Sequence, residues 1–157
     1  MSTERTCGAL VLLVAAAVAP AQSAPAPGHE SDAVLVAVLR QVAQAMVEKG
    51  GVACLAVDPG GAPQSVEPEL LESFADLPFV RRGAECEARP DGAVELVTDR
   101  PAVLVTAGPI EWVEDDEAWV TVRYFRTAVL SAERLYRVVR EKSGWVSLGQ
   151  IVRMAPA

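Results

Sequence analysis

The sequence predicts an α+β domain, in which an N-terminal helix and a second short helix pack on an antiparallel β-meander of about four to six strands. Two observations support this class. Apolar residues recur at every third or fourth position near the start of the chain, and at every second position from Ala93 onward. The length of 157 residues is sufficient for one domain with a substantial core.

An uninterrupted apolar run, ALVLLVAAAVA, lies near the start of the chain. It is too short to cross a bilayer, which takes about 20 residues, but it has the length of a secretory signal core. Small residues permit cleavage after Ala21 or Ser23, and Ser23 avoids a proline just inside the cut. The alternative, a buried N-terminal helix, conflicts with the Pro/Ala-rich stretch that follows. We therefore expect a signal peptide at 1–23, a linker at 24–30 and a single domain at 31–157.

Export determines how the cysteines are interpreted. Cys7 would be removed with the signal peptide, which leaves Cys54 and Cys86 in an oxidising compartment, either the periplasm or the exterior. A disulfide between them would add about 3–4 kcal/mol of stability on the chain-entropy account. The alternative is two buried free thiols, because a sequence gives no Cα separation. A redox role is disfavoured, since no Cys-x-x-Cys pair is present.

The first half of the chain contains the predicted helices. The clearest helix runs from Ser31, a suitable N-cap, to the Gly50-Gly51 stop. A buried strand is predicted at Val52–Val57, and a second helix at about Pro68–Leu77. The stretch Phe79–Asp91 is expected to be irregular. The apolar stripe of the first helix consists of Val34, Leu35, Val38, Leu39, Val42, Ala45 and Met46.

The second half of the chain contains the predicted strands. Six runs have strand character: AVELV, AVLVTAG, IEWVE, AWVTVRYFR, RLYRVVRE and WVSLGQIVRM. Turn-like stretches such as TDRP, EDDE and KSG separate them. Such short links permit only antiparallel neighbours, so this half is predicted to be a meander.

These residues carry a resemblance. The segments PELLESF, AEC, GPIEWVEDDEAWVTVRYF and RLYRVVREKSGWVSL resemble a group of uncharacterised exported bacterial proteins of unknown function, roughly from Val52 to the C-terminus. A helix before a strongly bent antiparallel meander is also similar to the NTF2-like and cystatin-like architectures. The resemblance implies a fold more than a function. NTF2-like domains can hold a small ligand between sheet and helices, which is an analogy at the level of the fold.

The acidic stretch EDDE is the most suggestive of function, as a cation site, a pair of catalytic acids or a hairpin tip. With its two aspartates as the turn, Glu114 faces Glu117, and Trp112 faces Trp119 as a cross-strand aromatic pair. Calcium needs about six or seven oxygens around one point, and glycosidase carboxylates must face each other across a cleft. A hairpin tip provides neither arrangement. We therefore predict a hairpin.

Other chemistries find little support. His29 is the only histidine and lies in the expected linker, so triads that need a rigidly placed imidazole are disfavoured. No zinc-ligand set and no phosphate-binding loop is recognised, and we expect neither metal nor cofactor. The net charge of −7 disfavours nucleic acid and anionic membranes as partners. Tyr124 and Tyr136 are interpreted as sheet residues, although carboxylate or tyrosine chemistry stays open.

Arginines are frequent on the predicted strands. Pairing with nearby glutamates on a solvated face is the simplest interpretation. An arginine-lined pocket for an anionic small molecule is the alternative, and its candidate ligand-binding residues are Arg123 and Arg137, with Tyr124. The strand arginines are Arg123, Arg126, Arg134, Arg137, Arg140 and Arg153, and the glutamates are Glu95, Glu111, Glu133 and Glu141.

These patterns favour a small exported domain without catalytic activity, which binds a small molecule or another protein. The alternative is a small NTF2-like enzyme that uses carboxylate or tyrosine chemistry in a sheet–helix pocket. A polar cluster pointing into a closed sheet–helix pocket would favour the enzyme, whereas a pocket filled by Leu, Val and Phe would favour a binding or structural role. No membrane span is expected in the mature chain, and the sequence leaves the oligomeric state open.

Overall fold

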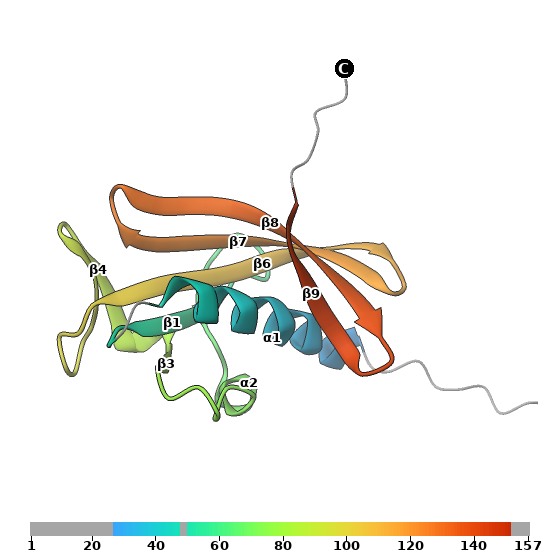
Figure 1. Ribbon diagram of the computed structural model, residues 1–157, viewed down its shortest axis with the longest axis horizontal. Helices are drawn as coiled ribbons and strands as arrows, with labels where there is room; N and C mark the ends of the chain where they lie inside the picture. The colour runs from blue at the N-terminus through green and yellow to red at the C-terminus, as the bar shows by residue number, and fades with distance from the viewer. Residues whose placement is uncertain (1–26, 48–49, 152–157) are drawn as a thin grey trace, which may run out of the picture.

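The computed structural model describes residues 27–47 and 50–151 (Figure 1). It has two α-helices and a mixed, mostly antiparallel seven-stranded sheet with a separate two-stranded sheet. The predicted α+β class is confirmed, with more strands than expected. The predicted signal peptide lies outside the described residues. In chain order the elements are α1 (Pro27–Met46), β1 (Val52–Val57), β2 (Gln64–Ser65), α2 (Pro68–Glu72), β3 (Val80–Arg82), η1 (Gly83–Glu85), β4 (Cys86–Arg89), β5 (Gly92–Glu95), β6 (Ala102–Glu114), β7 (Glu117–Thr127), β8 (Leu130–Glu141) and β9 (Gly144–Ile151).

Helix α1 buries one face against the concave side of the sheet. Its predicted stripe is correct at Val34, Val38 and Val42, which are almost completely buried. The helix begins at Pro27, four residues before the expected cap at Ser31, because proline is favoured in a first helical turn. Residues 27–30 of the expected linker therefore belong to α1.

Helix α2 is shorter than predicted. It ends at Glu72, and the chain continues to Leu77 through four-residue turns, one of which is closed by the bond from the Phe74 N–H to the Leu71 carbonyl. Phe74 is buried as expected. Arg40 of α1 holds this segment, since its guanidinium lies 5.6 Å from the Phe74 ring centroid and donates to both carboxylate oxygens of Asp76 at 2.6 and 2.9 Å.

The seven-stranded sheet has the order β2-β1-β6-β7-β8-β9, and β3 pairs with β1. Strands β6 to β9 form the predicted antiparallel meander. Strand β1, however, runs parallel to both β3 and β6, so the sheet as a whole is mixed and extends beyond the antiparallel meander that was predicted. The physical reason is the long connection over 58–101, which allows the chain to return in the same direction.

The stretch predicted to be irregular is ordered as β3, η1 and β4. Strand β4 pairs with β5 in a hairpin, which covers part of the sheet face opposite α1. The predicted disulfide between Cys54 and Cys86 is present, with Cα atoms 6.3 Å apart. Because the bridge joins β1 to β4, it fixes this hairpin to the main sheet, where Ala93 and Phe125 complete a small apolar cluster.

A buried carboxylate stabilises the turn after β5. Glu95 is only 4% exposed and accepts bonds from Arg81 at 2.7 Å, from Arg100 at 3.0 Å and from the Thr98 hydroxyl. The Thr98 bond and the two guanidinium groups outweigh the effect of burial and lower the pKa of Glu95 to about 2. The cluster links β3, β5 and the turn between β5 and β6.

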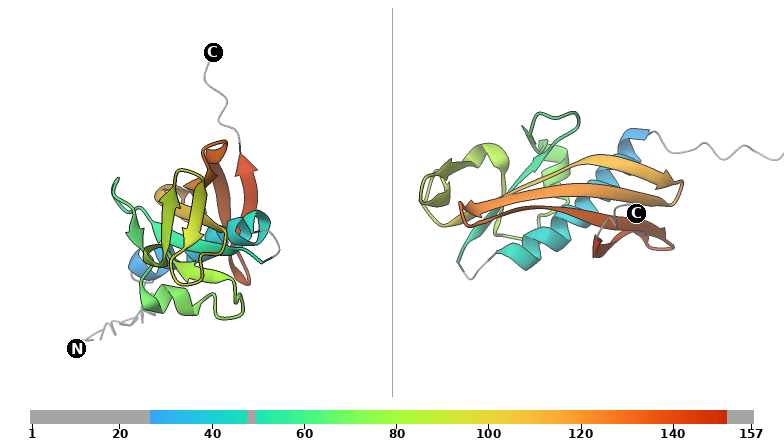
Figure 2. Two further views of the ribbon diagram at one scale, coloured as in Figure 1. Left: turned by 90° about the vertical axis from the view of Figure 1, so that its left-hand side faces the viewer. Right: turned by 90° about the horizontal axis from the view of Figure 1, so that it is seen from above.

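The main core lies between α1 and the sheet. Seen from above, α1 crosses diagonally beneath the strands of the meander (Figure 2). Within the described residues, no helix is both long enough and apolar enough to span a membrane. Fully buried side chains in this core include Val34, Val38, Leu39, Val42, Leu55, Val105, Val120, Val122 and Val138.

Candidate functional site

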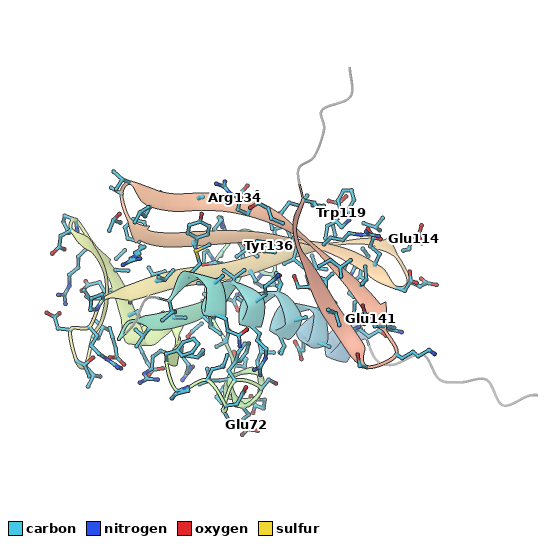
Figure 3. All side chains as sticks on the ribbon, in the orientation of Figure 1. Glu72, Glu114, Trp119, Arg134, Tyr136 and Glu141 are labelled. Carbon is cyan, nitrogen blue, oxygen red and sulfur yellow. A yellow bond between two sulfur atoms is a disulfide. The ribbon has the colours of Figure 1, made fainter. Side chains whose placement is uncertain are left out.

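A cleft opens between the first half of α1, the end of β1 and the middle of β6. Its volume is about 400 Å³, which is within the range of small-molecule sites. It lies toward the end of the molecule where α1 begins, the end at which Figure 3 places Glu114 and Glu141. Its apolar walls are formed by Leu35, Val57, Ile110 and Trp112. The polar α1 residues at its mouth are Ser31 and Asp32.

Gly108 shapes the inner end of the cleft. Its φ is +121°, and a Cβ at this position would overlap the backbone carbonyl of Asp58, so only glycine allows this approach. Strand β6 also gains one residue relative to β7 between Ala107 and Ile110. Such a bulge changes the face to which later side chains point. Here it places Ile110 opposite the buried Val120, on the side of α1.

Trp112 lies two residues beyond Ile110 and faces α1 as well, and a second bulge follows it. Glu114 pairs with Glu117 as predicted, but Trp112 pairs with Ala118 because another extra residue lies between Trp112 and Glu114. The predicted cross-strand pair of Trp112 with Trp119 is therefore wrong. A shift of one residue moves a side chain to the opposite face. Trp112 consequently lines the cleft, with 44% of its surface exposed.

The indole of Trp112 contacts a second tryptophan. Its ring meets the Trp145 ring edge to face, with centroids 5.6 Å apart and an interplanar angle of 69°. The guanidinium of Arg140 lies 4.9 Å from the Trp145 ring centroid and forms an ion pair with Glu30 of α1. This contact fixes the edge strand β9 and the start of α1 around the cleft.

Asp58 borders the cleft, but its carboxylate is already bonded. The residue is 2% exposed, and its oxygens accept from the N–H groups of Gly60 and Gly61 and from Arg123. Burial alone would raise the pKa of Asp58, yet the bonds from Gly61 and Arg123 outweigh it and leave the pKa below the usual value. Asp58 is therefore a structural anion, which holds the loop after β1 against β7.

The sequence-predicted ligand residues do not converge. Arg123 and Arg137 lie on the sheet face opposite α1, where Arg123 pairs with Asp58 and Arg137 pairs with Glu117 at 2.6 Å. Tyr124 is on the other face and packs against the main core. These three side chains form no common pocket. Each of the two arginines instead forms an ion pair with its own carboxylate partner.

The acidic stretch forms the predicted hairpin tip, with β6 ending at Glu114 and β7 beginning at Glu117. Glu117 accepts from Arg137 and, at 2.8 Å, from the indole Nε1–H of Trp119. These bonds hold the pKa of Glu117 below its usual value. The carbonyl of Asp116 accepts from the backbone N–H of Arg140 at 2.8 Å. Among the described residues, no three His, Cys, Asp or Glu side chains are grouped to hold a metal ion.

Sequence reasoning missed the cleft residues Leu35, Ile110 and Trp112 as a site. One signal was available. A Gly-Pro pair at positions 108 and 109 interrupts an otherwise regular strand pattern, and glycine or proline inside a strand marks a bulge or a close backbone approach. That signal indicates where the pattern breaks, but not which face the later side chains take.

Comparison with known proteins gives no match. No family matches the chain, and no curated protein or solved structure is significantly similar to it.

Proposed function

We propose that the protein is an exported binding domain without catalytic activity, and that the cleft beside Trp112 holds a small ligand with an apolar body. The observation that carries this proposal is the partly exposed indole of Trp112 on an apolar wall. Partly exposed aromatic side chains at a concave apolar site are typical of ligand-binding positions.

The filled core supports binding over catalysis. Valine and leucine side chains occupy the space between α1 and the sheet, so no polar cavity remains there. Among the described residues, every buried side-chain nitrogen or oxygen has a hydrogen-bond partner. Catalytic sites usually combine several convergent ionisable groups, whereas the described lining of the cleft holds two, Asp32 and Asp58, and Asp58 is already paired with Arg123.

Export is part of the same proposal. Its support is the apolar N-terminal run of the sequence together with the Cys54–Cys86 disulfide, which is stable in an oxidising compartment. A helix followed by a bent antiparallel meander likewise supports the proposal of an NTF2-like or cystatin-like architecture, which here rests on topology alone.

The alternative, an enzyme that uses tyrosine or carboxylate chemistry, has less support. Tyr136 is 7% exposed, and burial together with neighbouring Tyr124 raises its pKa. A raised pKa keeps the phenol protonated, so Tyr136 is poorly suited to act as a base at neutral pH. Asp58 is held by Arg123 and is not available as a base either.

The three tryptophans of the chain provide a direct test by NMR. The probe is 2-(1-naphthyl)ethanol, a neutral aromatic alcohol, titrated into the ¹⁵N-labelled protein. We expect the indole Nε1–H signal of Trp112 to shift saturably and that of Trp145 to follow. The Trp119 signal should stay unchanged, because its side chain lies on the opposite face of the sheet.

Two variants form a matched pair. Trp112→Ala should lower the affinity for the naphthyl alcohol at least about tenfold, since a large part of the apolar wall is removed. Trp119→Ala should leave the affinity unchanged. Equal shifts of all three indole signals, or no saturable shift at Trp112, would contradict the proposed site.

A further inference from the structure

The charges at the cleft indicate what kind of ligand it accepts. Two ionisable residues line it, Asp32 and Asp58, and both are acidic. The charge of Asp58 is compensated by Arg123. Asp32 is exposed at the mouth, and among the described residues no basic side chain pairs with it. The lining therefore presents one uncompensated negative charge beside an apolar wall.

Arg140 stacks on Trp145, the neighbour of Trp112, and its charge is already paired. Its partner is Glu30, so it adds little positive potential at the mouth. The positive end of the α1 dipole is confined to the first turn, whereas Asp32 is the sixth residue of a helix that starts at Pro27. The chain as a whole carries a net charge of −7, which attracts cations over a longer range.

The indole of Trp112 adds a second attraction for positive charge. An ammonium group near an aromatic face is attracted by the negative face of the ring, even at a partly exposed site. Trp112 and Asp32 line the same cleft, one as an aromatic surface and the other as a carboxylate. Leu35 and Ile110 line the same cleft and provide apolar contact.

We propose that the cleft selects a small organic cation, an amine carried on an apolar body, with its ammonium group at Asp32 and its body against Leu35, Ile110 and Trp112. The inference rests on the proposed binding function and adds the charge of the ligand. An anionic ligand of the same shape is disfavoured by the same carboxylate. The observation that supports this choice is charge complementarity with the lining of the cleft.

The test compares three probes that share one aromatic body. They are 2-(1-naphthyl)ethylammonium, 2-(1-naphthyl)ethanol and 1-naphthylacetate, each titrated while the Trp112 indole signal is followed. We expect the ammonium to bind about fivefold more tightly than the alcohol, and the carboxylate to bind most weakly. Raising the salt concentration should reduce the preference for the ammonium, because an exposed ion pair is screened.

The variant Asp32→Asn isolates the contribution of the carboxylate. It should reduce the preference for the ammonium to about twofold or less and leave the affinity of the alcohol unchanged. Asp91→Asn is the matched control, because Asp91 is an exposed acid in the turn between β4 and β5, at the opposite end of the molecule (Figure 1). This control should change neither affinity.

The outcomes separate the two proposals. Equal binding of the alcohol and the ammonium would overturn selection for a cation and leave the binding cleft in place. Retention of the full preference for the ammonium in Asp32→Asn would also overturn the role assigned to Asp32. Failure of all three probes to shift the Trp112 signal would overturn the cleft itself as a binding site.

Discussion

Trp112 and Trp145 meet edge to face at 5.6 Å, although β6 and β9 are separated in the sheet by β7 and β8. Neighbouring strands lie about 4.8 Å apart, so two rings on a flat sheet would be too distant to touch. The contact shows that the meander curls around α1 at this end. The strong twist of antiparallel strands makes such curvature possible.

The first prediction concerns this aromatic contact. Trp112→Ala and Trp145→Ala should each lower the free energy of unfolding. The double variant should lose less of this free energy than the sum of the two single losses. The coupling free energy from a double-mutant cycle should be about 0.5–1.5 kcal/mol, as for other aromatic pairs. Urea unfolding of the four proteins measures it. The pair Trp119 and Trp145, which lie on opposite faces of the sheet, is the control and should show a coupling near zero. An equally small coupling for Trp112 and Trp145 would contradict the contact between their rings.

The second prediction concerns Gly108. Gly108→Ala should destabilise the protein by about 2–3 kcal/mol, because its φ is positive and the added Cβ would overlap the Asp58 backbone. Gly60→Ala is the control, since a Cβ there meets nothing within 4 Å, and its effect should stay within about 0.5 kcal/mol. Comparable losses in both variants would show that the close approach at Gly108 is not what constrains this position.

The third prediction concerns acid stability. The pKa of Glu95 is about 2 in the folded protein, against 4.5 for an ordinary glutamate. Because the folded value is the lower one, the contribution of Glu95 to stability is complete above the ordinary value and is lost as the pH falls from 4.5 toward 2. The contribution should be at most about 3 kcal/mol. The free energy of unfolding, measured by urea between pH 7 and pH 2.5, tests this.

Glu95→Gln should be less stable than the parent protein at pH 7 by about 1–3 kcal/mol, because Arg81 and Arg100 keep partial access to water. The difference between the two proteins should shrink as the pH falls. Glu87→Gln is the control, since Glu87 is exposed and pairs only with Arg89 among the interactions described. A constant difference between Glu95→Gln and the parent at all pH values would rule out the titration of Glu95 as the cause.

The sequence was sufficient to predict the elements whose pattern is local. The stripe through Val34, Val38 and Val42 and the alternation in the meander both result from one buried face, so periodicity reveals them. The strand Val52–Val57 has the predicted bounds. Strands β3 and β4 were missed because they have no apolar pattern of their own. Strand pairing and the disulfide hold them in place.

The candidate site could not be predicted, because it depends on strand bulges and on non-local strand pairing. The face occupied by Trp112 depends on an extra residue in β6, and strand alternation counted from the hairpin turn gives the opposite face. The parallel pairing of β1 with β6 depends on a long connection, which local patterns do not reveal. The pairing of Cys54 with Cys86 was predictable because removal of the expected signal peptide leaves no other cysteine.

The last prediction concerns this disulfide, which closes a loop with a sequence separation of 32. Replacement of Cys54 and Cys86 by alanine should destabilise the protein by about 3–4 kcal/mol, as expected from loop-closure entropy. Reduction of the parent protein should produce the same loss. The β4–β5 hairpin should then separate from the sheet first, because the cluster that it covers is small. Urea unfolding measures the loss, and hydrogen exchange at Ala93 locates it. A loss below about 1 kcal/mol would mean that non-covalent contacts alone hold the hairpin.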